Sequence, residues 1–494
     1  MRNLEDFPVP IDGEVTLCEI NGRMQCMNHE FANVSTFTTA VDKHPKVHIT
    51  RDLLHLPNLG DEGRALFLPT DVPFLKQLTQ VYAEQGLKEV LHTATLHQHL
   101  LISQSARFLL AVWRYLRKAR LILNPSLEYH SCELIDELSQ TRNWANNTIK
   151  CIAWHLHNSR LAVATCDDSV RIYCNDSSFV PLLRCKQQRN VTCLAWRPMS
   201  LTEIAVGHEN GIIIWHVDFN SLVTRPSVSN SIMLQRVDHK PVMSLAWSPR
   251  GNLLVSAAAL DSNILVWDVE LNKTSVLKGS RDSGNILLKW SPAKDKLLSV
   301  SNGIVFRIWD CQHWENERWT VPSGRVQAAC WTSCGTSLLF ATSTEPVIYG
   351  LNMKSDHVFS SNSESSIDHA VPLFDLSKID LEGIAVGGIV QSMEADPKGN
   401  HLAVFFKDTS CVALFSVIKS PLLQLIPSSL IVGLAAEVPS TIAFQYNFKP
   451  GACLSIAWSS GHLQHFPIIY TDLTNDFNAS QYVQSQIRSL NNSR

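Results

Sequence analysis

Short apolar runs separated by polar turns dominate the chain from residue 149 onward. The best-formed example is the stretch 242–268, VMSLAWSPRGNLLVSAAALDSNILVWD, in which two apolar runs flank the turn at 249–251 and a third run follows the turn at 261–263. Short runs rich in Leu, Ile and Val, bounded by Gly, Pro, Asn and Asp, are typical of β-strands joined by tight turns. Because a three-stranded meander cannot bury both of its faces alone, the pattern predicts further copies of this unit.

In each copy the first strand ends at an anchor position that is usually tryptophan. The anchors are Trp154, Trp196, Trp247, Trp290 and Trp331, with Ala395 and Phe444 in two divergent copies. A second aromatic residue closes the third strand about 20 residues later, at Tyr173, Trp215, Trp267, Trp309, Tyr349, Phe415 and Phe466. Seven copies of four short strands, with a period of about 40 to 45 residues, predict an all-β fold: a seven-bladed WD-repeat β-propeller.

The remaining sequence does not follow this period, and we divide the chain into four regions. These are an N-terminal extension at 1–70, a helical segment at 71–145, the propeller at 146–470 and a disordered tail at 471–494. The helical prediction rests on composition, because good helix formers dominate before residue 138 while Gly and Pro nearly vanish. Within the propeller, the longer copies predict a loop at 216–238 and a Ser- and Asp-rich insertion at 352–390.

Val15 to Ile20 forms an isolated run with strand-like alternation in the N-terminal extension. A propeller with an incomplete last blade exposes an unpaired strand edge, which promotes aggregation. The seventh copy supplies strands near 441–446, 451–458 and 461–467, after which the β pattern ends. We therefore expect residues 15–20 to pair as the outer strand of the last blade. Residues 24–70, which show no period, are expected to lie extended over another part of the molecule.

Composition narrows the class of protein. The 494 residues are 45% hydrophobic and carry a formal net charge of -3, which fits a globular protein without an overall positive charge for nucleic acid or anionic membrane. Thirteen cysteines without a CxxC pair favour free thiols in a reducing compartment. The start of the chain lacks a signal-peptide pattern, and no uninterrupted apolar run reaches about 18 residues. We expect a soluble intracellular protein that does not bind nucleic acid directly.

Four residues of the third copy occur where WD repeats place a buried hydrogen-bond network: His239, Ser256, Asp261 and Trp267. A buried indole N–H needs an acceptor, and a Ser–His–Asp chain supplies one. The same residue types could form a catalytic triad, but no Gly-x-Ser-x-Gly turn surrounds the serine, so we assign a structural role. The predicted blade network also includes Trp154, Trp196, Trp247, Trp290, Trp309 and Trp331, and we expect Asp168 and Asp408 at the equivalent turns of blades 1 and 6.

Motifs for enzymatic chemistry are absent from the sequence, which contains no GxxxxGK[ST], GxGxxG or HExxH and no evident pair of catalytic carboxylates. We therefore predict a protein that is not an enzyme, with no catalytic, cofactor-binding or metal-binding residues and no cofactor. His92, His97 and His99 could face one metal, but no cysteine or carboxylate pair completes the site, and we interpret them as helix-surface residues. Cys330 and Cys334 are interpreted as packing residues.

A basic stripe in the helical segment is the one concentration of charge, and it comprises Arg107, Arg114, Arg117, Lys118 and Arg120. The opposite helix face is apolar, with Phe108, Val112, Tyr115, Leu116 and Ala119. Two interpretations remain open. The stripe is either a solvated helix face, or a docking surface for an acidic partner or for the cytosolic face of a membrane protein.

Six stretches go beyond generic propeller patterning: GEVTL at 13–17, DDSVRIY at 167–173, QRNV at 188–191, LAWRP at 194–198, SLVTRPS at 221–227 and PVMSLAW at 241–247. In these stretches, and over nearly its full length, the chain resembles the aladin family of WD-repeat nucleoporins. The stretch 221–227 is the most specific, because a loop between blades has no reason to recur in unrelated WD proteins. The divergent sixth copy and the short tail after Tyr470 depart from the family pattern.

The resemblance implies a non-enzymatic scaffold and adaptor of the nuclear pore complex. Such a protein is held at the nuclear envelope by a transmembrane nucleoporin, contacts other pore proteins, associates with the membrane only indirectly and supports nucleocytoplasmic transport of protein and mRNA. The implied locations are the nuclear envelope and pore, the cytoplasm, and the spindle or centrosome in mitosis. The alternative is a generic WD-repeat adaptor such as a ubiquitin-ligase substrate receptor. A propeller with a large non-repeating appendage and no catalytic constellation fits either kind of recognition platform.

Overall fold

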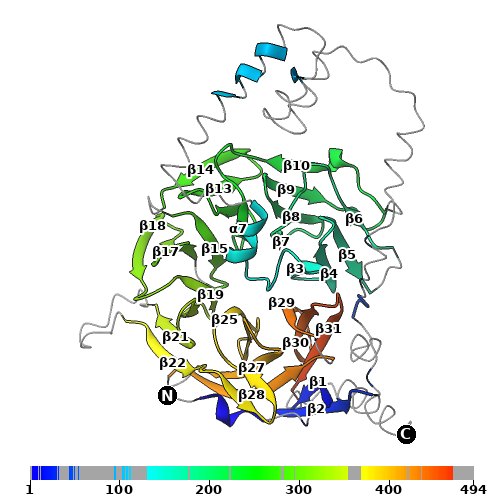
Figure 1. Cartoon of the computed structure of the whole chain (residues 1–494), viewed down its shortest axis with the longest axis vertical. Coiled ribbons are helices and arrows are strands. Elements are labelled where there is room, and N and C mark those ends of the chain that lie inside the picture. Colours follow the sequence, from blue (N-terminus) through cyan, green and yellow to red (C-terminus); the bar gives the residue numbers. More distant parts are fainter. Residues whose placement is uncertain are drawn as a thin grey trace.

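Seven β-sheets surround a central axis in the computed structural model of the chain, which confirms the predicted seven-bladed propeller (Figure 1). The structure describes residues 3–32 with breaks at 9–10, 12 and 31, short stretches between 44 and 112, and residues 131–470 with gaps at 176–178, 222–223, 280–282, 294, 354–368, 420–421 and 435–436. Both the described N-terminal strands and the last described strand belong to the same blade.

Blades 1 to 3 are four-stranded antiparallel sheets whose strands follow sequence order. Blade 1 contains β3 (Ile149–Trp154), β4 (Arg160–Thr165), β5 (Val170–Cys174) and β6 (Leu182–Leu183). Blade 2 contains β7 (Cys193–Trp196), β8 (Glu203–His208), β9 (Gly211–His216) and β10 (Ser231–Leu234). Blade 3 contains β11 (Val242–Trp247), β12 (Leu253–Ala258), β13 (Ile264–Asp268) and β14 (Lys273–Leu277).

Blades 4 to 6 repeat this arrangement. Blade 4 contains β15 (Asn285–Trp290), β16 (Lys296–Ser301), β17 (Val305–Asp310) and β18 (Glu315–Thr320). Blade 5 contains β19 (Val326–Trp331), β20 (Ser337–Thr342), β21 (Val347–Asn352) and β22 (Val371–Asp375). Blade 6 contains β25 (Val390–Ala395), β26 (His401–Phe406), β27 (Cys411–Ile418) and β28 (Gln424–Val432).

Blade 7 is completed by the N-terminal part of the chain. Its strands are β29 (Pro439–Phe444), β30 (Gly451–Trp458), β31 (Leu463–Ile469), β1 (Glu14–Ile20) and β2 (Arg23–Asn28), in that spatial order. β1 pairs with β31 in parallel, at Glu19 with Ile468 and Ile20 with Ile469. The expected pairing of residues 15–20 with the last blade is therefore confirmed, although β2 and not β1 is the outermost strand.

The inner strands form a closed ring. β3, β7, β11, β15, β19, β25 and β29 each contact the next in turn, and β29 contacts β3. Their side chains surround a central channel that runs along the axis of the disc. Residues from the starts of these strands line a cavity beside Leu138 and Ser139, and the strand ends with their tryptophan anchors line a second cavity.

Two predicted loops are partly strand. The range 216–238 contains β10, the fourth strand of blade 2. The range 352–390 contains β22, the fourth strand of blade 5, and a separate hairpin of β23 (Ile379–Leu381) and β24 (Ile384–Val386). Interpreting the extra length as loop was wrong in these places, because strand propensity is read from short stretches and both fourth strands lie far from their neighbours in sequence.

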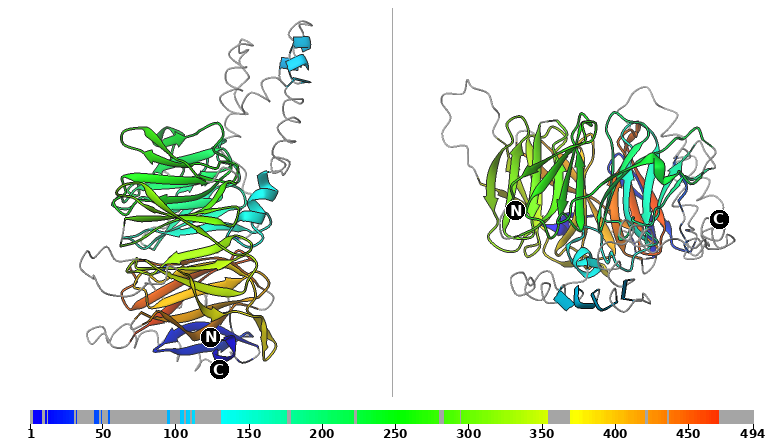
Figure 2. Two further views of the ribbon diagram at one scale, coloured as in Figure 1. Left: turned by 90° about the vertical axis from the view of Figure 1, so that its left-hand side faces the viewer. Right: turned by 90° about the horizontal axis from the view of Figure 1, so that it is seen from above.

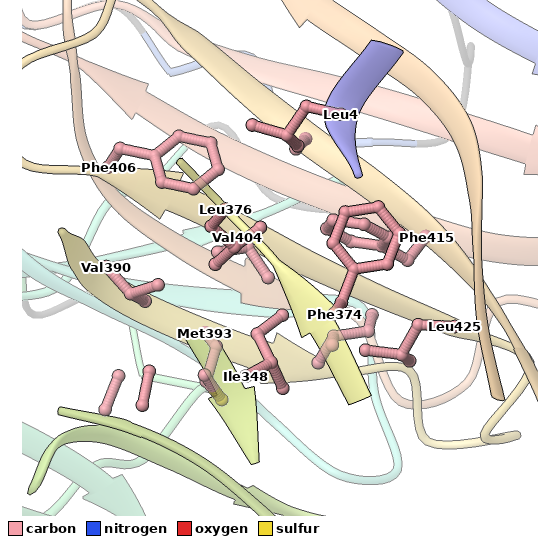
Figure 3. Packing of buried hydrophobic residues seen from close by; sticks show 14 of the residues in the cluster. Leu4, Ile348, Phe374, Leu376, Val390, Met393, Val404, Phe406, Phe415 and Leu425 are labelled. Atoms are coloured by element: carbon pink, nitrogen blue, oxygen red, sulfur yellow. The ribbon is translucent and has the colours of Figure 1, made fainter. Parts of the chain in front are cut away.

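Described N-terminal residues hold the ring from outside, and we call residues 4–7, 14–28 and 44–47 the N-terminal belt. The 3-10 helix η1 (Leu4–Asp6) precedes Phe7, whose ring meets Phe415 of blade 6 edge-on at 5.1 Å. Leu4 and Phe7 are buried in a cluster built by blades 5 and 6. Figure 3 shows Leu4 among the labelled residues of this cluster. Further along, Val47 and Ile49 are buried against blades 1 and 7. The belt thus covers the seams on both sides of blades 6 and 7.

The helix α7 (Ser131–Leu138) lies on one flat face of the disc, near its axis (Figures 1 and 2). Leu134, Ile135 and Leu138 are buried against the first strands of blades 3 to 5. The following residues, 139–147, continue across the same face. Residues 139–147 pack on the propeller. The predicted boundary between the helical segment and the propeller, at residue 146, therefore separates residues that belong to one packed unit.

Candidate interaction surface

A hydrogen-bonded chain runs through blade 3. Asp261 Oδ2 lies 2.8 Å from His239 Nδ1, and His239 Nε2 lies 2.8 Å from Ser256 Oγ. The indole N–H of Trp267 donates to the same Ser256 Oγ at 2.8 Å. The chain links the loop before the first strand, the second strand, the turn after it and the third strand. All four predicted residues are brought together.

The burial and charge of these four residues determine what the hydrogen-bond network can do chemically. Burial alone would raise the pKa of Asp261, but hydrogen bonds from His239 and from the Asn263 N–H lower it below its ordinary value. Ser256 is fully buried and His239 is 2% exposed, so a substrate cannot approach the serine. The atoms are ordered as in a Ser–His–Asp triad, yet the geometry serves to satisfy a buried indole N–H.

Other blades contain parts of the same hydrogen-bond network. In blade 4, Trp309 Nε1 donates to Ser299 Oγ at 2.9 Å, and in blade 2, Trp215 Nε1 donates to Gln188 Oε1 at 3.1 Å. In blade 1, Asp167 and not Asp168 accepts from the backbone N–H two residues later, as Asp261 does in blade 3. The expected equivalence of Asp168 was therefore wrong.

Asp168 and Asp408, the two aspartates predicted at turn positions, make different contacts. Asp168 accepts from the Val191 N–H of the next blade and lies 3.5 Å from Lys150 Nζ. Asp408 lies close enough to Arg142 to oppose the lowering effect of burial on the guanidinium pKa. Asp168 therefore connects blade 1 to the start of blade 2, and Asp408 of blade 6 interacts with Arg142.

The tryptophans that end the first strands join neighbouring blades. Their indole N–H groups donate to the preceding blade: Trp154 to Ser455 Oγ at 2.9 Å, Trp196 to Ala153 O at 3.0 Å, Trp247 to Ala195 O at 3.2 Å and Trp331 to Lys289 O at 2.9 Å. Trp290 Nε1 has no hydrogen-bond partner within the described part of the chain. These anchors thus stabilise seams between blades, whereas Trp267 and Trp309 stabilise single blades.

Residues 137–144 close the channel on the α7 face. Gln391 Nε2 donates to Ser139 O at 2.8 Å, and Arg325 donates to Glu137 O at 3.0 Å. The indole of Trp144 is 1% exposed, donates to Val191 O at 3.2 Å and lies under Lys150 Nζ at 3.8 Å from the ring centre. Beneath this cap a cavity of about 180 Å³ remains.

The candidate cysteines lie in different surroundings. Cys330 is buried, and burial raises its pKa well above the ordinary value. Cys334 is exposed, and its interpretation as a packing residue was wrong. Burial would raise the Cys334 pKa, but hydrogen bonds with Thr332 and Thr336 and the charge of Lys419 lower it to about 7. Over the described ranges no three metal-ligating side chains gather.

Most of the predicted basic stripe lies outside the described residues. Of its five members only Arg107 is described, and it is exposed. Beside it, Phe108 is 69% exposed, Leu109 50% and Val112 39%. Neither this helical turn nor its charge is buried against the propeller. His92, His97 and His99 also lie outside the described residues.

Sequence reasoning missed the polar contacts of the N-terminal belt. Thr16 Oγ1 donates to Val432 O at 3.1 Å and accepts from Val432 N at 2.7 Å. Glu19 is 2% exposed and accepts from Ser428 Oγ at 3.0 Å and Ser429 Oγ at 2.7 Å. Burial raises the Glu19 pKa, and the two hydroxyls partly offset that rise. β1 therefore holds blade 6 as well as blade 7.

Fold and networks together define a WD-type β-propeller scaffold. A profile described as Aladin seven-bladed propeller matches residues 130–469. The match covers more than half of the chain, and the protein belongs to the aladin propeller family. Its start at residue 130 agrees with the packing of α7 on the disc.

Individual proteins and solved structures resemble parts of the chain. Aladin from Arabidopsis thaliana is 26% identical over 352 residues, which are 65% of this chain and 75% of that protein. The GATOR2 complex protein Mio from Drosophila melanogaster is 26% identical over 196 residues, which are 30% of this chain and 22% of that protein. A chain of the crystal structure of a mitotic checkpoint complex has a TM-score of 0.47 and 18% identity, covering 66% of this chain and 96% of that one.

Across the described residues, no helix combines the length and the apolar character that crossing a membrane requires.

Proposed function

We propose that this propeller scaffold is a non-enzymatic adaptor of the nuclear pore complex. In this proposal a transmembrane nucleoporin holds it at the nuclear envelope, and it supports nucleocytoplasmic transport and takes part at the mitotic spindle. Membership of the aladin propeller family carries the proposal. The architecture supports it, because a ring with buried polar networks and a belt around its seams presents surfaces in fixed geometry.

The experiment is proximity cross-linking of the tagged full chain in cells, followed by identification of the nearest neighbours. The expected neighbours are pore proteins, among them one with membrane-spanning segments. Neighbours drawn from a ubiquitin-ligase core would support the alternative adaptor and contradict the pore assignment.

The helical segment is the part that we propose contacts the pore partner. Phe108, Leu109 and Val112 are exposed apolar residues beside the exposed Arg107. Exposed apolar side chains flanked by positive charge suit a partner helix or surface that combines apolar and acidic groups. Because α7 fixes the end of this segment on one flat face, contacts made by the segment are expected on that side.

A deletion designed from the structure tests this surface. Removal of residues 56–128 with a flexible linker in their place leaves the belt, α7 and the channel cap intact. A folded product that loses its cross-links to the membrane-spanning neighbour supports the proposal. Retention of these cross-links would assign the contact to the propeller. A second variant replaces Arg107, Arg114, Arg117, Lys118 and Arg120 with glutamine and separates charge from deletion.

A further inference from the structure

The apolar face of the helical segment also carries a serine. The described residues between 103 and 112 are helical. Four of their exposed side chains have the spacing i, i+3, i+4 and i+7, which places them on one side of an α-helix: Ser105, Phe108, Leu109 and Val112. Ser105 therefore shares a face with the three apolar side chains that we propose contact a partner.

The sequence around Ser105 is basic. Arg107 follows the serine by two positions and is exposed. Residues 90–127 contain five Arg or Lys residues and no Asp or Glu. Protein kinases select their substrates partly through charge complementarity with the residues around the hydroxyl group. This setting therefore suits a kinase that prefers basic sequences.

Exposure distinguishes Ser105 from the other residues with the same local pattern. Five Ser or Thr residues in the sequence have Arg or Lys two positions later: Ser105, Thr148, Ser169, Ser248 and Ser323. Thr148, Ser169 and Ser248 are buried. Ser323 is half-buried, and its hydroxyl lies 3.0 Å from Thr344 Oγ1. Because a kinase must reach the hydroxyl with its own active site, the exposed Ser105 is the candidate among these five.

A phosphate group on Ser105 changes the character of this face. Phosphoserine carries a charge of about -1.5 to -2 at neutral pH. Its neighbours on the face are Phe108 and Leu109, whereas Arg107, two residues away, lies on another side of the helix. The charge is therefore not paired on its own face, and burying it against an apolar partner is costly. Acidic groups of the partner would in addition repel it.

We propose that Ser105 is a phosphorylation site for a kinase that prefers basic sequences, and that its phosphate releases the partner from the helical segment. The kinase transfers the γ-phosphoryl group of ATP. The serine oxygen forms the new P–O bond, the bond to the β-phosphate oxygen breaks, ADP leaves, and the hydroxyl proton passes to the base of the kinase. The site itself stands on exposure and charge, and the release of the partner rests on the proposed function.

Phosphate incorporation into the purified full chain tests the site. The chain is incubated with ATP and either protein kinase C, which accepts basic sequences, or casein kinase II, which requires acidic ones, and mass spectrometry locates the phosphate. We expect phosphate at Ser105 with protein kinase C and none at this position with casein kinase II. Arg107→Gln should reduce the incorporation at Ser105 at least about fivefold. An unmodified Ser105 after treatment with protein kinase C would overturn the proposal.

Proximity cross-linking of charge variants tests the release of the partner. Ser105→Asp should lower cross-linking to the membrane-spanning neighbour at least about tenfold, whereas Ser105→Asn, which has the same size without the charge, should keep it. Ala111→Glu is the matched control, because it adds a negative charge at an exposed position outside the apolar face.

Equal cross-linking by Ser105→Asp and Ser105→Asn would overturn the release. If the unmodified chain has no membrane-spanning neighbour, the pore assignment fails, while the incorporation measured on purified protein still decides the site. A failure of phosphate incorporation leaves the pore assignment standing.

Discussion

The indole N–H of Trp154 in blade 1 donates to Ser455 Oγ in blade 7 at 2.9 Å. The same serine bonds His465 Nδ1 at 2.9 Å, and His465 Nε2 lies 3.1 Å from the carbonyl of Pro45. Since a carbonyl only accepts, the histidine carries its proton on Nε2 and accepts from the serine through Nδ1. One buried chain thus connects the first blade, the last blade and the belt where the ring closes.

Replacement of Ser455 tests this closure. Ser455→Ala leaves the buried Trp154 N–H and His465 Nδ1 without partners, and we expect a loss of about 1–3 kcal/mol in unfolding free energy. The measurement is the shift in thermal and urea midpoints. Adding Trp154→Phe removes the orphaned donor, so the double variant should lose less than the sum of the single losses. Strict additivity would show that the two residues act independently.

Substitutions of Thr16 test how the N-terminal belt is held on blade 6. Thr16→Val removes the hydroxyl that both donates to Val432 O and accepts from its N–H, and leaving this backbone pair unsatisfied should cost about 1–3 kcal/mol. Thr16→Ser keeps the hydroxyl and should stay close to wild type. Equal stability of the two variants would exclude a role for these bonds in holding β1 on blade 6.

Acid is expected to destabilise the protein through its buried histidines. Burial lowers the pKa of His465 to about 3 and that of His401 to about 4, from an ordinary value of 6.5. Below about pH 6.5 the histidines of the unfolded chain take up protons, while the buried histidines of the folded chain do not. The unfolding free energy therefore decreases as the pH is lowered from about 6.5 to these folded pKa values. His465→Gln should flatten this fall. Thermal midpoints measured from neutral to acidic pH test it, and an unchanged slope would contradict it.

Substitution of Ser256 tests its structural role in blade 3. Ser256→Ala leaves the Trp267 indole N–H and His239 Nε2 without partners, whereas Ser299→Ala in blade 4 leaves only the Trp309 indole N–H without one. Both should destabilise, with the larger loss, about 2–3 kcal/mol, for Ser256. Unfolding of the two purified variants gives the comparison. Equal losses would show that the bond to His239 contributes nothing.

The repeated part of the fold could be predicted because each copy carries its own anchor and turn residues. The strand at Val15–Ile20 was predictable from the need to complete the last blade. Its partner β2 was missed because its sequence, RMQCMN, contains no β-branched residue. The turn Asn21-Gly22, with φ 51 and φ 74, was the available signal, since this pair is typical of a two-residue hairpin.

The surfaces were harder to predict than the fold. The cap depends on Trp144, the single aromatic residue of the polar stretch 139–147, whose indole N–H bonds Val191 O in another blade. Ala395, which takes the place of the tryptophan anchor, lines a cavity of about 570 Å³ together with residues of the other blades. The cross-channel pair of Lys289 and Glu394 joins blades that are not adjacent. Such contacts leave no local pattern.

The most direct measurement of the central claim is the location of the tagged full chain in living cells at native expression level. A pore adaptor predicts a continuous rim at the nuclear envelope that coincides with pore markers in interphase, and loss of that rim in the variant without residues 56–128. A diffuse signal from the folded full chain, with no enrichment at the rim, would contradict the account.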